Sequence, residues 1–340
     1  MTPHGLIVGF CEGFTTDFPG QAPFVEAALH DAGWNVQSHH GFESRFPDGE
    51  LCIDLPEDPS GRTVLLCQSV TGAHAPADAS LMSLLAAARS YREHGAGRIA
   101  AMLPHLAYAR HDRHVPGQRR PLMAGLLADL ARTAGLNDIV TIASGAQDLL
   151  RPLFIRSGAQ LTFLPVHELH LELLHPLIGR ETVLVAPDRG AADQVAMLAA
   201  TLKRPLLVAD KRRVGPEQVD VTLRAPYDIG DVPHAVVVDD LITSAATVET
   251  VTSAIRERSP AVRIDVIATH LRLTPSGSRR LGRLLESGAI SSVHTTDAVG
   301  QRPRMKGLSF TAAIPWMAPA LAARLHSQAC PARQERRTTS

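Results

Sequence analysis

The stretch that decides the fold is AVVVDDLITSAATVETV, residues 235–251. Its first four residues, 235–238, are apolar and mostly β-branched, which predicts a buried parallel strand. Two carboxylates, Asp239 and Asp240, follow at the carboxyl edge of that strand, and a helix is expected to begin near Val248. Open parallel sheets bind ligands at this edge, so the sequence predicts a binding site here.

The residues between the acidic pair and the helix predict a phosphate site. A small-residue loop at a helix N-terminus exposes N–H groups at the positive end of the helix dipole, and hydroxyl groups add donors. Carboxylates would repel the phosphate itself, so they suit sugar hydroxyls or a bridging Mg²⁺, and a sugar phosphate meets both requirements. In the alternative, Asp240 only starts a loop and a threonine only caps the helix. The loop residues are Thr243, Ser244, Ala245, Ala246 and Thr247.

Other short apolar runs alternate with segments that have apolar residues at helical spacing, such as LMAGLLADLARTAG. Strands alternating with helices predict βαβ units and parallel sheets covered on both faces, an α/β fold. The alternation runs to about Gly145 and starts again near Val183, which predicts two tandem domains. We expect the first at residues 1–160, the second at 161–312, a terminal helix at 313–328 and a tail at 329–340. The strand candidates are GLIVGF, TVLLCQS, RIAAMLPHL, DIVTIAS, TVLVAPD, PLLVAD, AVVVDD and RIDVIATHL.

The composition narrows the class of protein. The chain has 340 residues, 45% of them hydrophobic, and 34 basic residues balance 34 acidic ones, so no nucleic-acid or acidic-membrane partner is expected. The sequence has no apolar run of membrane-span length and no signal-peptide pattern, so we expect a cytoplasmic protein. The cysteines lack C-x-x-C spacing, which favours free thiols over a disulfide or zinc site. They are Cys11, Cys52, Cys67 and Cys330.

Residues 235–251 resemble the phosphoribosyl-diphosphate binding motif of type I phosphoribosyltransferases and ribose-phosphate pyrophosphokinases. The resemblance implies that the acidic pair contacts the ribose 2- and 3-hydroxyls and that the amides of residues 243–247 bind the 5-phosphate. The usual loop is Asp-Thr-Gly/Ala-Gly-Thr, so this chain lacks the first Asp and the Gly but keeps Thr247. Ala246 places a Cβ where the backbone approaches the phosphate.

The segment RFPDGEL, residues 45–51, resembles a pyrophosphokinase signature that the transferases lack. The resemblance implies that Phe46, Asp48 and Glu50 contact the adenine of ATP. A base requires a flat apolar surface and acceptors for its exocyclic amine. A Pro-Asp-Gly turn between two strands is the alternative for this segment.

The segment HLAYARHDR, residues 105–113, resembles a second pyrophosphokinase signature. The resemblance implies that Arg110 binds the nucleotide phosphates, with His111 in place of the usual Gln and Asp112 following it. A guanidinium fork suits a triphosphate. His111 and His114 could equally be solvated loop residues.

The segment DKRR, residues 210–213, contains the residues that the resemblance implies as catalytic cations. In the resembled family it is a mobile loop that closes over the triphosphate, so Lys211 and Arg213 are expected to neutralise charge during transfer. A solvated run of surface charge is the alternative.

The expected metal site departs from the family pattern. After DIVTI the family usually has Asp-Leu-His-Ala, whose His helps to bind Mg²⁺, but this chain has Gly145 at the His position. Gln147 or Asp148 could reach the same space. The partner acid, Asp188 in APDRG, is retained. Because Mg²⁺ keeps several waters and binds substrate phosphates, losing one ligand need not abolish binding.

The resemblance covers residues 6–326 in unbroken order and implies two phosphoribosyltransferase-like domains. It implies an ATP-dependent pyrophosphokinase that transfers the diphosphoryl group of ATP to the 1-hydroxyl of ribose 5-phosphate or a related pentose phosphate. It also implies Mg²⁺ and a homo-oligomer. The alternative is a non-catalytic homologue that binds nucleotide or regulates an active paralogue. A phosphoribosyltransferase would not need the ATP segments.

Overall fold

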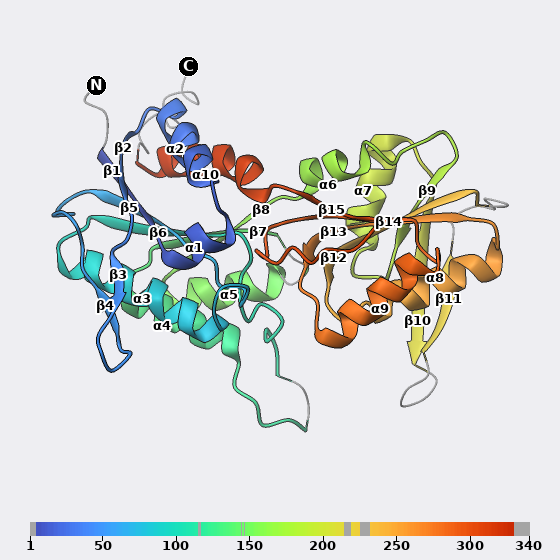
Figure 1. Cartoon of the computed structure of the whole chain (residues 1–340), viewed down its shortest axis with the longest axis horizontal. Coiled ribbons are helices and arrows are strands. Elements are labelled where there is room, and N and C mark those ends of the chain that lie inside the picture. Colours follow the sequence, from blue (N-terminus) through green and yellow to red (C-terminus); the bar gives the residue numbers. More distant parts are fainter. Residues whose placement is uncertain are drawn as a thin grey trace, which may run out of the picture. The chain divides into compact units, whose positions relative to one another are not determined.

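The computed structural model describes residues 5–114, 117–143, 145, 147–213, 219–224 and 232–329. The chain divides into two compact units (Figure 1). Unit 1 contains the chain up to Leu164 and the segment from Ala313, and unit 2 is Pro165–Ala312. Each unit is a mainly parallel sheet flanked by helices, which confirms the predicted fold class.

Unit 1 contains a six-stranded, fully parallel sheet with the order β2-β1-β5-β6-β7-β8, and a separate antiparallel hairpin, β3-β4. Helices α2 and α10 lie on one face of the sheet, and α3, α4 and α5 lie on the other (Figure 1). The strands are β1 (Gly5–Phe10), β2 (Asn35–His39), β3 (Glu43–Arg45), β4 (Leu51–Ile53), β5 (Thr63–Cys67), β6 (Arg98–Leu103), β7 (Asp138–Ile142) and β8 (Gln160–Leu164). The helices are α1 (Glu12–Asp17), α2 (Ala22–Asp31), α3 (Ala77–Glu93), α4 (Met123–Ala134), α5 (Gln147–Ser157) and α10 (Ala313–Ala329).

Unit 2 contains a seven-stranded sheet with the order β11-β10-β9-β12-β13-β14-β15, in which only the edge pair β10-β11 is antiparallel. Its strands are β9 (Thr182–Ala186), β10 (Leu206–Arg213), β11 (Val219–Arg224), β12 (His234–Ile242), β13 (Arg263–Leu271), β14 (Ser292–Thr296) and β15 (Leu308–Thr311). Its helices are α6 (His167–Leu174), α7 (Ala192–Leu202), α8 (Ala246–Arg258) and α9 (Pro275–Glu286).

The central strands of unit 2 are apolar at successive positions because the sheet is covered on both faces. On β12, Val237 packs into a cluster with α8 and α9, whereas Val236 and Val238 pack into a second cluster with α6 and α7. Successive side chains of a strand point to opposite faces. The acidic pair follows directly on this two-sided apolar run.

Between about Gly145 and Val183, where the sequence suggests a break in the alternation, the chain still forms regular elements. It forms α5, then β8 at the edge of the unit 1 sheet, and then α6 of unit 2. Pro152 lies inside α5 and interrupts the apolar spacing that identifies a helix in sequence.

Helix α10 belongs to unit 1, although the whole of unit 2 precedes it in the chain. It packs against α2, and the Arg324 Nε donates to Asp138 Oδ2 at 2.8 Å. The Gln328 Nε2 reaches the same carboxylate oxygen at 3.2 Å, and its Oε1 accepts from Arg98 Nη2 at 2.7 Å. Asp138 is fully buried at the start of β7, so α10 supplies the polar partners that this carboxylate requires.

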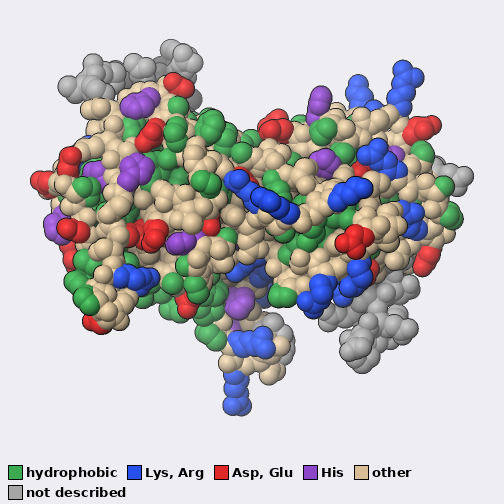
Figure 2. Space-filling model, in the orientation of Figure 1, with side chains coloured by type: hydrophobic (Ala, Val, Ile, Leu, Met, Phe, Trp, Pro, Cys, Tyr) green, Lys and Arg blue, Asp and Glu red, His purple; other side chains and the backbone are tan. Residues whose placement is uncertain are grey.

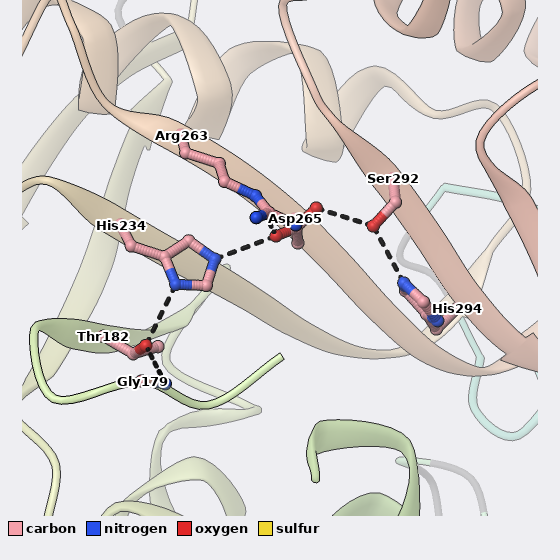
Figure 3. A network of polar contacts seen from close by, with 7 residues as sticks. All are labelled: Gly179, Thr182, His234, Arg263, Asp265, Ser292 and His294. Atoms are coloured by element: carbon pink, nitrogen blue, oxygen red, sulfur yellow. Dashed lines mark hydrogen bonds and ion pairs between the residues drawn. The ribbon is translucent and has the colours of Figure 1, made fainter. Parts of the chain in front are cut away.

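A second buried carboxylate, Asp265, lies near the start of β13 and joins neighbouring strands (Figure 3). Its Oδ2 accepts from His234 Nε2 at 2.8 Å and lies 2.9 Å from Arg263 Nε, and its Oδ1 accepts from Ser292 Oγ at 2.6 Å. Ser292 also contacts His294 Nε2 at 2.8 Å. Burial alone would raise the pKa of Asp265, but the hydrogen bonds and the Arg263 charge hold it below its ordinary value.

The surface agrees with the balanced composition. The face shown in Figure 2 carries both signs of charge, with acidic side chains more prominent on unit 1 and basic ones on unit 2. Within the described ranges, no helix is both long and apolar enough to cross a membrane. Three of the cysteines, Cys11, Cys52 and Cys67, are free thiols, and Cys330 lies outside the described residues.

Candidate functional site

The acidic pair lies on β12 itself, because this strand is longer than its apolar run. We predicted that the strand ends at Val238, but it continues to Ile242. Its pairing with β9 stops at Val237, whereas its pairing with β13 continues as far as Ile242 and Leu271. The two carboxylates therefore lie beyond the end of β9 at the carboxyl edge of the sheet, where open parallel sheets bind ligands.

The two carboxylates are electrostatically linked. The Asp239 Oδ1 accepts the backbone N–H of Asp240 at 2.9 Å. Burial is the largest cause that raises the pKa of Asp239, followed by the charge of Asp240, and Asp188 adds to the same effect. Two neighbouring carboxyls in such a site favour sharing one proton. A pair in this state can both donate to and accept from the hydroxyl groups of a ligand.

The predicted phosphate loop is a short turn between β12 and α8. Helix α8 begins at Ala246, two residues before the predicted start, and its N-cap residue is Ala245 rather than a threonine. Ala245 has no side-chain oxygen that could cap the first-turn N–H groups, and its backbone is left-handed, with φ 54° and ψ 12°. Thr243 and Ser244 precede it, and Thr247 lies in the first turn of α8.

The candidate metal ligand Asp188 follows β9. Its Oδ1 accepts the backbone N–H of Ala191 at 3.1 Å, so it also shapes the start of α7. Among the residues that the structure describes, no group of three His, Cys, Asp or Glu side chains could hold a metal ion. The acidic cluster of Asp188, Asp239 and Asp240 is compatible with Mg²⁺ only if waters and substrate phosphates complete the coordination.

A cation not singled out in the sequence lies beside Asp188. The Arg189 Nη2 lies 2.8 Å from Asp210 Oδ2, and Arg224 Nη2 lies 3.1 Å from the same oxygen. The Asp210 side chain is 7% exposed and that of Arg189 is 73% exposed. Asp210 therefore holds the Arg189 guanidinium in place, while most of the Arg189 side chain faces solvent at the carboxyl edge of the sheet.

The expected catalytic cations continue a strand. Lys211 and Arg213 lie in the last part of β10, opposite Val221 and Val219 of β11. The resemblance implied a loop here, but antiparallel pairing with β11 extends the strand to Arg213. Residues 214–218, which follow, lie outside the described ranges.

The expected adenine ligands lie at the tip of the β3-β4 hairpin in unit 1. The Phe46 N–H donates to Glu50 O at 2.8 Å, and the Glu50 N–H donates to Asp48 Oδ1 at 3.1 Å. Gly49 has φ 91°, which the turn requires. The Pro-Asp-Gly turn is thus present, and it exposes Phe46 to 51% together with both acids.

A pocket of about 270 Å³ lies beside this hairpin. Glu43 lines it, accepting the backbone N–H of Glu12 at 3.0 Å and the hydroxyl of Ser83. These contacts fix the base of the hairpin on α1 and α3. The tip that carries Phe46 projects beyond this anchored base.

The second segment predicted to bind nucleotide, residues 105–113, follows β6. His105 is buried, Arg110 and His111 are exposed, and Asp112 is partly buried. Tyr108 is left-handed, with φ 60°, and its carbonyl accepts the His111 N–H at 2.9 Å. The turn places Arg110 and His111 at the surface beyond the carboxyl end of β6.

At the position of the expected metal-site His, Gly145 is exposed just after β7. Its neighbours Ser144 and Ala146 lie outside the described residues. Asp148 is exposed in the first turn of α5, and Gln147 is partly buried.

Sequence reasoning also missed a buried histidine below the acidic pair. The His170 Nε2 contacts Thr269 Oγ1 at 2.7 Å, and its Nδ1 lies 3.2 Å from Gln194 Nε2. Burial is the main cause that lowers the pKa of His170 to about 4, whereas the Asp240 charge raises it. The only signal was a histidine on the inward face of α6. His170 stays neutral near pH 7 and adds no positive charge to the site.

Taken together, an acidic pair at the carboxyl end of a parallel strand and the short turn that follows it into a helix define a protein of the phosphoribosyltransferase fold class. Family models agree: residues 27–135 match the N-terminal domain of ribose phosphate pyrophosphokinase, and residues 168–279 match the phosphoribosyl transferase domain.

Individual relatives cover most of the chain. A ribose-phosphate pyrophosphokinase of Pasteurella multocida is 30% identical over 78% of this chain and 80% of its own. One of Coxiella burnetii is 32% identical over 67% of this chain and 69% of its own. The structure of phosphoribosylpyrophosphate synthetase from Mycobacterium smegmatis shares the fold, with a TM-score of 0.75, 23% identity, and coverage of 95% and 98% of the two chains. The chain belongs to the ribose-phosphate pyrophosphokinase family.

Proposed function

We propose that this protein transfers the diphosphoryl group of ATP to the 1-hydroxyl of ribose 5-phosphate or a closely related pentose phosphate. The observation that carries the proposal is the acidic pair Asp239 and Asp240, followed directly by the turn into α8. A diol and a phosphate on one small sugar match these two features. Family membership supports ATP as the donor.

On the acceptor side, the acidic pair binds the ribose 2- and 3-hydroxyls. The raised pKa of Asp239 favours one shared proton, so the pair can donate to one hydroxyl oxygen and accept from another. The loop Thr243–Thr247 binds the 5-phosphate through backbone N–H groups and hydroxyls at the start of α8. Bound in this way, the sugar keeps its 1-hydroxyl free to react.

On the donor side, Phe46 provides the flat surface for adenine, and Asp48 and Glu50 accept from its amine. Arg110, His111 and Asp112 form the segment for the nucleotide phosphates. Lys211 and Arg213 are the cations that stabilise the charge developing during transfer. Mg²⁺ held near Asp188 supplies charge neutralisation on the phosphates when it is bound.

In the reaction, the 1-hydroxyl oxygen attacks the β-phosphorus of ATP, and the bond from that phosphorus to the α,β-bridging oxygen breaks. AMP leaves with the bridging oxygen, and the hydroxyl proton passes to solvent or to a nearby base. The products are phosphoribosyl diphosphate and AMP. Such a transfer depends on positioning and charge stabilisation more than on covalent chemistry by the protein.

We also propose that copies of this chain assemble into a homo-oligomer. The exposed hairpin tip with Phe46 is suited to contacting a site on another copy. The outer surfaces of α3, α4 and α5 expose several large apolar side chains, and exposed apolar groups of this kind are typical of interfaces. They are Met82, Leu126, Leu130, Leu149 and Ile155. Size-exclusion chromatography with light scattering tests this, and a monomer at all concentrations would contradict it.

The activity is tested by measuring AMP formed from ATP and Mg²⁺ with ribose 5-phosphate and a panel of other pentose phosphates. We expect AMP formation that depends on one sugar phosphate and is lost in Lys211→Ala. Lys306→Ala is the matched control, because Lys306 is an exposed lysine of the same unit. It should retain wild-type turnover.

The result also addresses the alternative that Gly145 raises. If no pentose phosphate supports AMP formation, the catalytic proposal is wrong. Nucleotide binding without turnover, or co-purification with an active paralogue, would then identify a non-catalytic homologue.

A further inference from the structure

The start of α9, about thirty residues after the phosphate loop, contacts that loop directly. The Thr274 N–H donates to the carbonyl oxygen of Thr243 at 3.2 Å. The Thr274 Oγ1 accepts the Gly277 N–H at 3.0 Å and so caps α9. One residue therefore fixes the start of α9 and ties it to the first residue of the loop.

Gly277 makes this approach possible. A Cβ added at Gly277 would lie 2.0 Å from the Thr243 carbonyl oxygen and 3.0 Å from the Ser244 Cα. Both neighbours are backbone atoms, which cannot move aside as a flexible side chain can. Any larger residue at Gly277 would therefore have to displace either α9 or the loop.

Arg280, one turn further along α9, makes the second tie. Its Nη1 donates to the Ser244 carbonyl oxygen at 2.7 Å, and its Nε lies 2.7 Å from Glu249 Oε2 on α8. The Arg280 side chain is only 29% exposed. A single guanidinium thus joins α9, the loop and the first turn of α8, and a donor of this kind makes stronger hydrogen bonds than a neutral one.

The contacts of Thr274 and Arg280 with the loop lie directly before a strained residue. Ala245 follows Ser244 and is left-handed, with φ 54°, a conformation that glycine adopts easily and alanine does not. Such strain persists only where the surroundings determine the backbone. The ties from Thr274 and Arg280 hold the two residues that precede Ala245, so they stabilise the turn that aims the N-terminus of α8 out of the sheet edge.

We propose that Gly277 and Arg280 are positioning residues for the sugar-phosphate site: they hold the loop Thr243–Ala245 in the left-handed turn required for phosphate binding. This inference rests on the proposed function, because it takes the ligand to be ribose 5-phosphate. Neither residue is expected to touch the reacting atoms. Loss of Arg280 should therefore weaken sugar-phosphate binding far more than ATP binding.

The test uses the full chain and measures KM for ribose 5-phosphate, KM for ATP, and binding of ribose 5-phosphate by isothermal titration calorimetry. We expect Arg280→Gln to raise the KM and Kd for ribose 5-phosphate about tenfold, as expected for loss of one charge-assisted hydrogen bond, with the KM for ATP changed less than about twofold. Arg279→Gln is the matched control, because Arg279 is an exposed neighbour on α9. It should change neither constant.

A double-mutant cycle separates positioning from a general loss of structure. Ala245→Gly removes the strain, so Arg280→Gln introduced into the Ala245→Gly background should raise the Kd for ribose 5-phosphate less than about threefold. Gly277→Ala should weaken binding at least as much as Arg280→Gln if it folds, and circular dichroism checks folding. Arg280→Gln remains decisive if Gly277→Ala does not fold.

The outcomes distinguish failure of the positioning role from failure of the proposed function. The positioning role would be overturned if Arg280→Gln changed the KM values for ribose 5-phosphate and ATP equally. It would also be overturned if Arg280→Gln raised the Kd equally in the wild-type and Ala245→Gly backgrounds. In either case, turnover by the wild-type protein would still uphold the proposed function. If the wild-type protein neither binds nor forms AMP with ribose 5-phosphate or any other pentose phosphate of the panel, the proposed function fails, and the positioning role fails with it.

Discussion

Replacing Asp265 with Asn tests how the unit 2 sheet is held together at the edge opposite its ligand site. The wild-type carboxylate is fully buried and interacts with His234, Arg263 and Ser292 (Figure 3). An Asn of nearly equal size has one acceptor and one NH₂ group. If its carbonyl oxygen faces His234 and Arg263, its NH₂ group faces Ser292, whose hydroxyl then has to change from donor to acceptor.

The expected loss follows from these contacts. Hydrogen bonds to a charged group contribute about 1.5–3 kcal/mol each, and the substitution removes the charge that strengthens the bonds from His234 and Ser292. The Arg263 ion pair adds little, because that side chain is 59% exposed. We therefore expect Asp265→Asn to lower the free energy of unfolding by about 2–4 kcal/mol, which corresponds to a decrease in Tm of roughly 5–12 °C.

The pH dependence has a definite sign. The folded-state pKa of Asp265 is below its ordinary value, so the folded protein binds fewer protons at this group than the unfolded chain does. Its contribution is fully present above the unfolded pKa of about 3.9 and is lost as the pH falls through the lower folded pKa. The stability difference between wild type and Asp265→Asn should be constant from about pH 5 to pH 7 and should shrink below about pH 4.

Urea unfolding followed by circular dichroism at several pH values measures both effects. Ser292→Ala is the comparison, because it removes one donor and leaves the carboxylate with His234 and Arg263. It should cost about 1 kcal/mol. A loss below about 0.5 kcal/mol for Asp265→Asn at pH 7, or a difference that does not shrink in acid, would refute the reasoning.

Three further predictions follow from single contacts. Asp240→Asn should lower the pKa of Asp239 toward its ordinary range because a neighbouring like charge is removed, whereas Asp188→Asn should lower it less. Carboxyl ¹³C NMR titration measures both shifts. An unchanged Asp239 pKa in Asp240→Asn would contradict the role of the Asp240 charge. Arg189→Ala and Arg224→Ala should each change stability only slightly, because either arginine still pairs with Asp210 when the other is removed. The double variant should lose more than the sum of the two, and additive losses in thermal unfolding would be inconsistent with that. Arg324→Gln should lower the free energy of unfolding by about 1–3 kcal/mol because it weakens the contacts of buried Asp138. Arg156→Gln, at an exposed position of α5, should have little effect. Equal melting temperatures for the two variants would argue against the Arg324–Asp138 contact.

The central strands were predictable from the sequence because both faces of each sheet are covered. Runs such as residues 183–186 and 235–238 are apolar at every position, which is the pattern of a buried parallel strand. The edge strands of both sheets, and β14 beside one of them, were not identified, although the near-edge strands β1, β7 and β10 were. β14 reads SVHTT and β15 reads LSFT, and such polar, short segments carry no clear periodicity.

The acidic pair and the phosphate loop were predictable because they are consecutive in the sequence. The exact end of β12 was not, because it depends on how far β13 continues beside it. The contacts of Gly277 and Arg280 with the loop depend on the packing of α9, which sequence spacing does not show. Arg189 is visible in the sequence, but its partner Asp210 becomes its neighbour only when β9 and β10 pair.

The return of α10 to unit 1 has a consequence for synthesis on the ribosome. Chains are translated from the N-terminus, so all of unit 2 is made before the residues that cover α2 and pair with Asp138. The middle of the chain can fold while the first part still exposes an apolar surface and while Asp138 has the Thr162 hydroxyl but lacks Arg324 and Gln328 as partners. Unit 1, which is first to be translated, is therefore last to be completed, and the nascent chain has to protect that surface until α10 emerges.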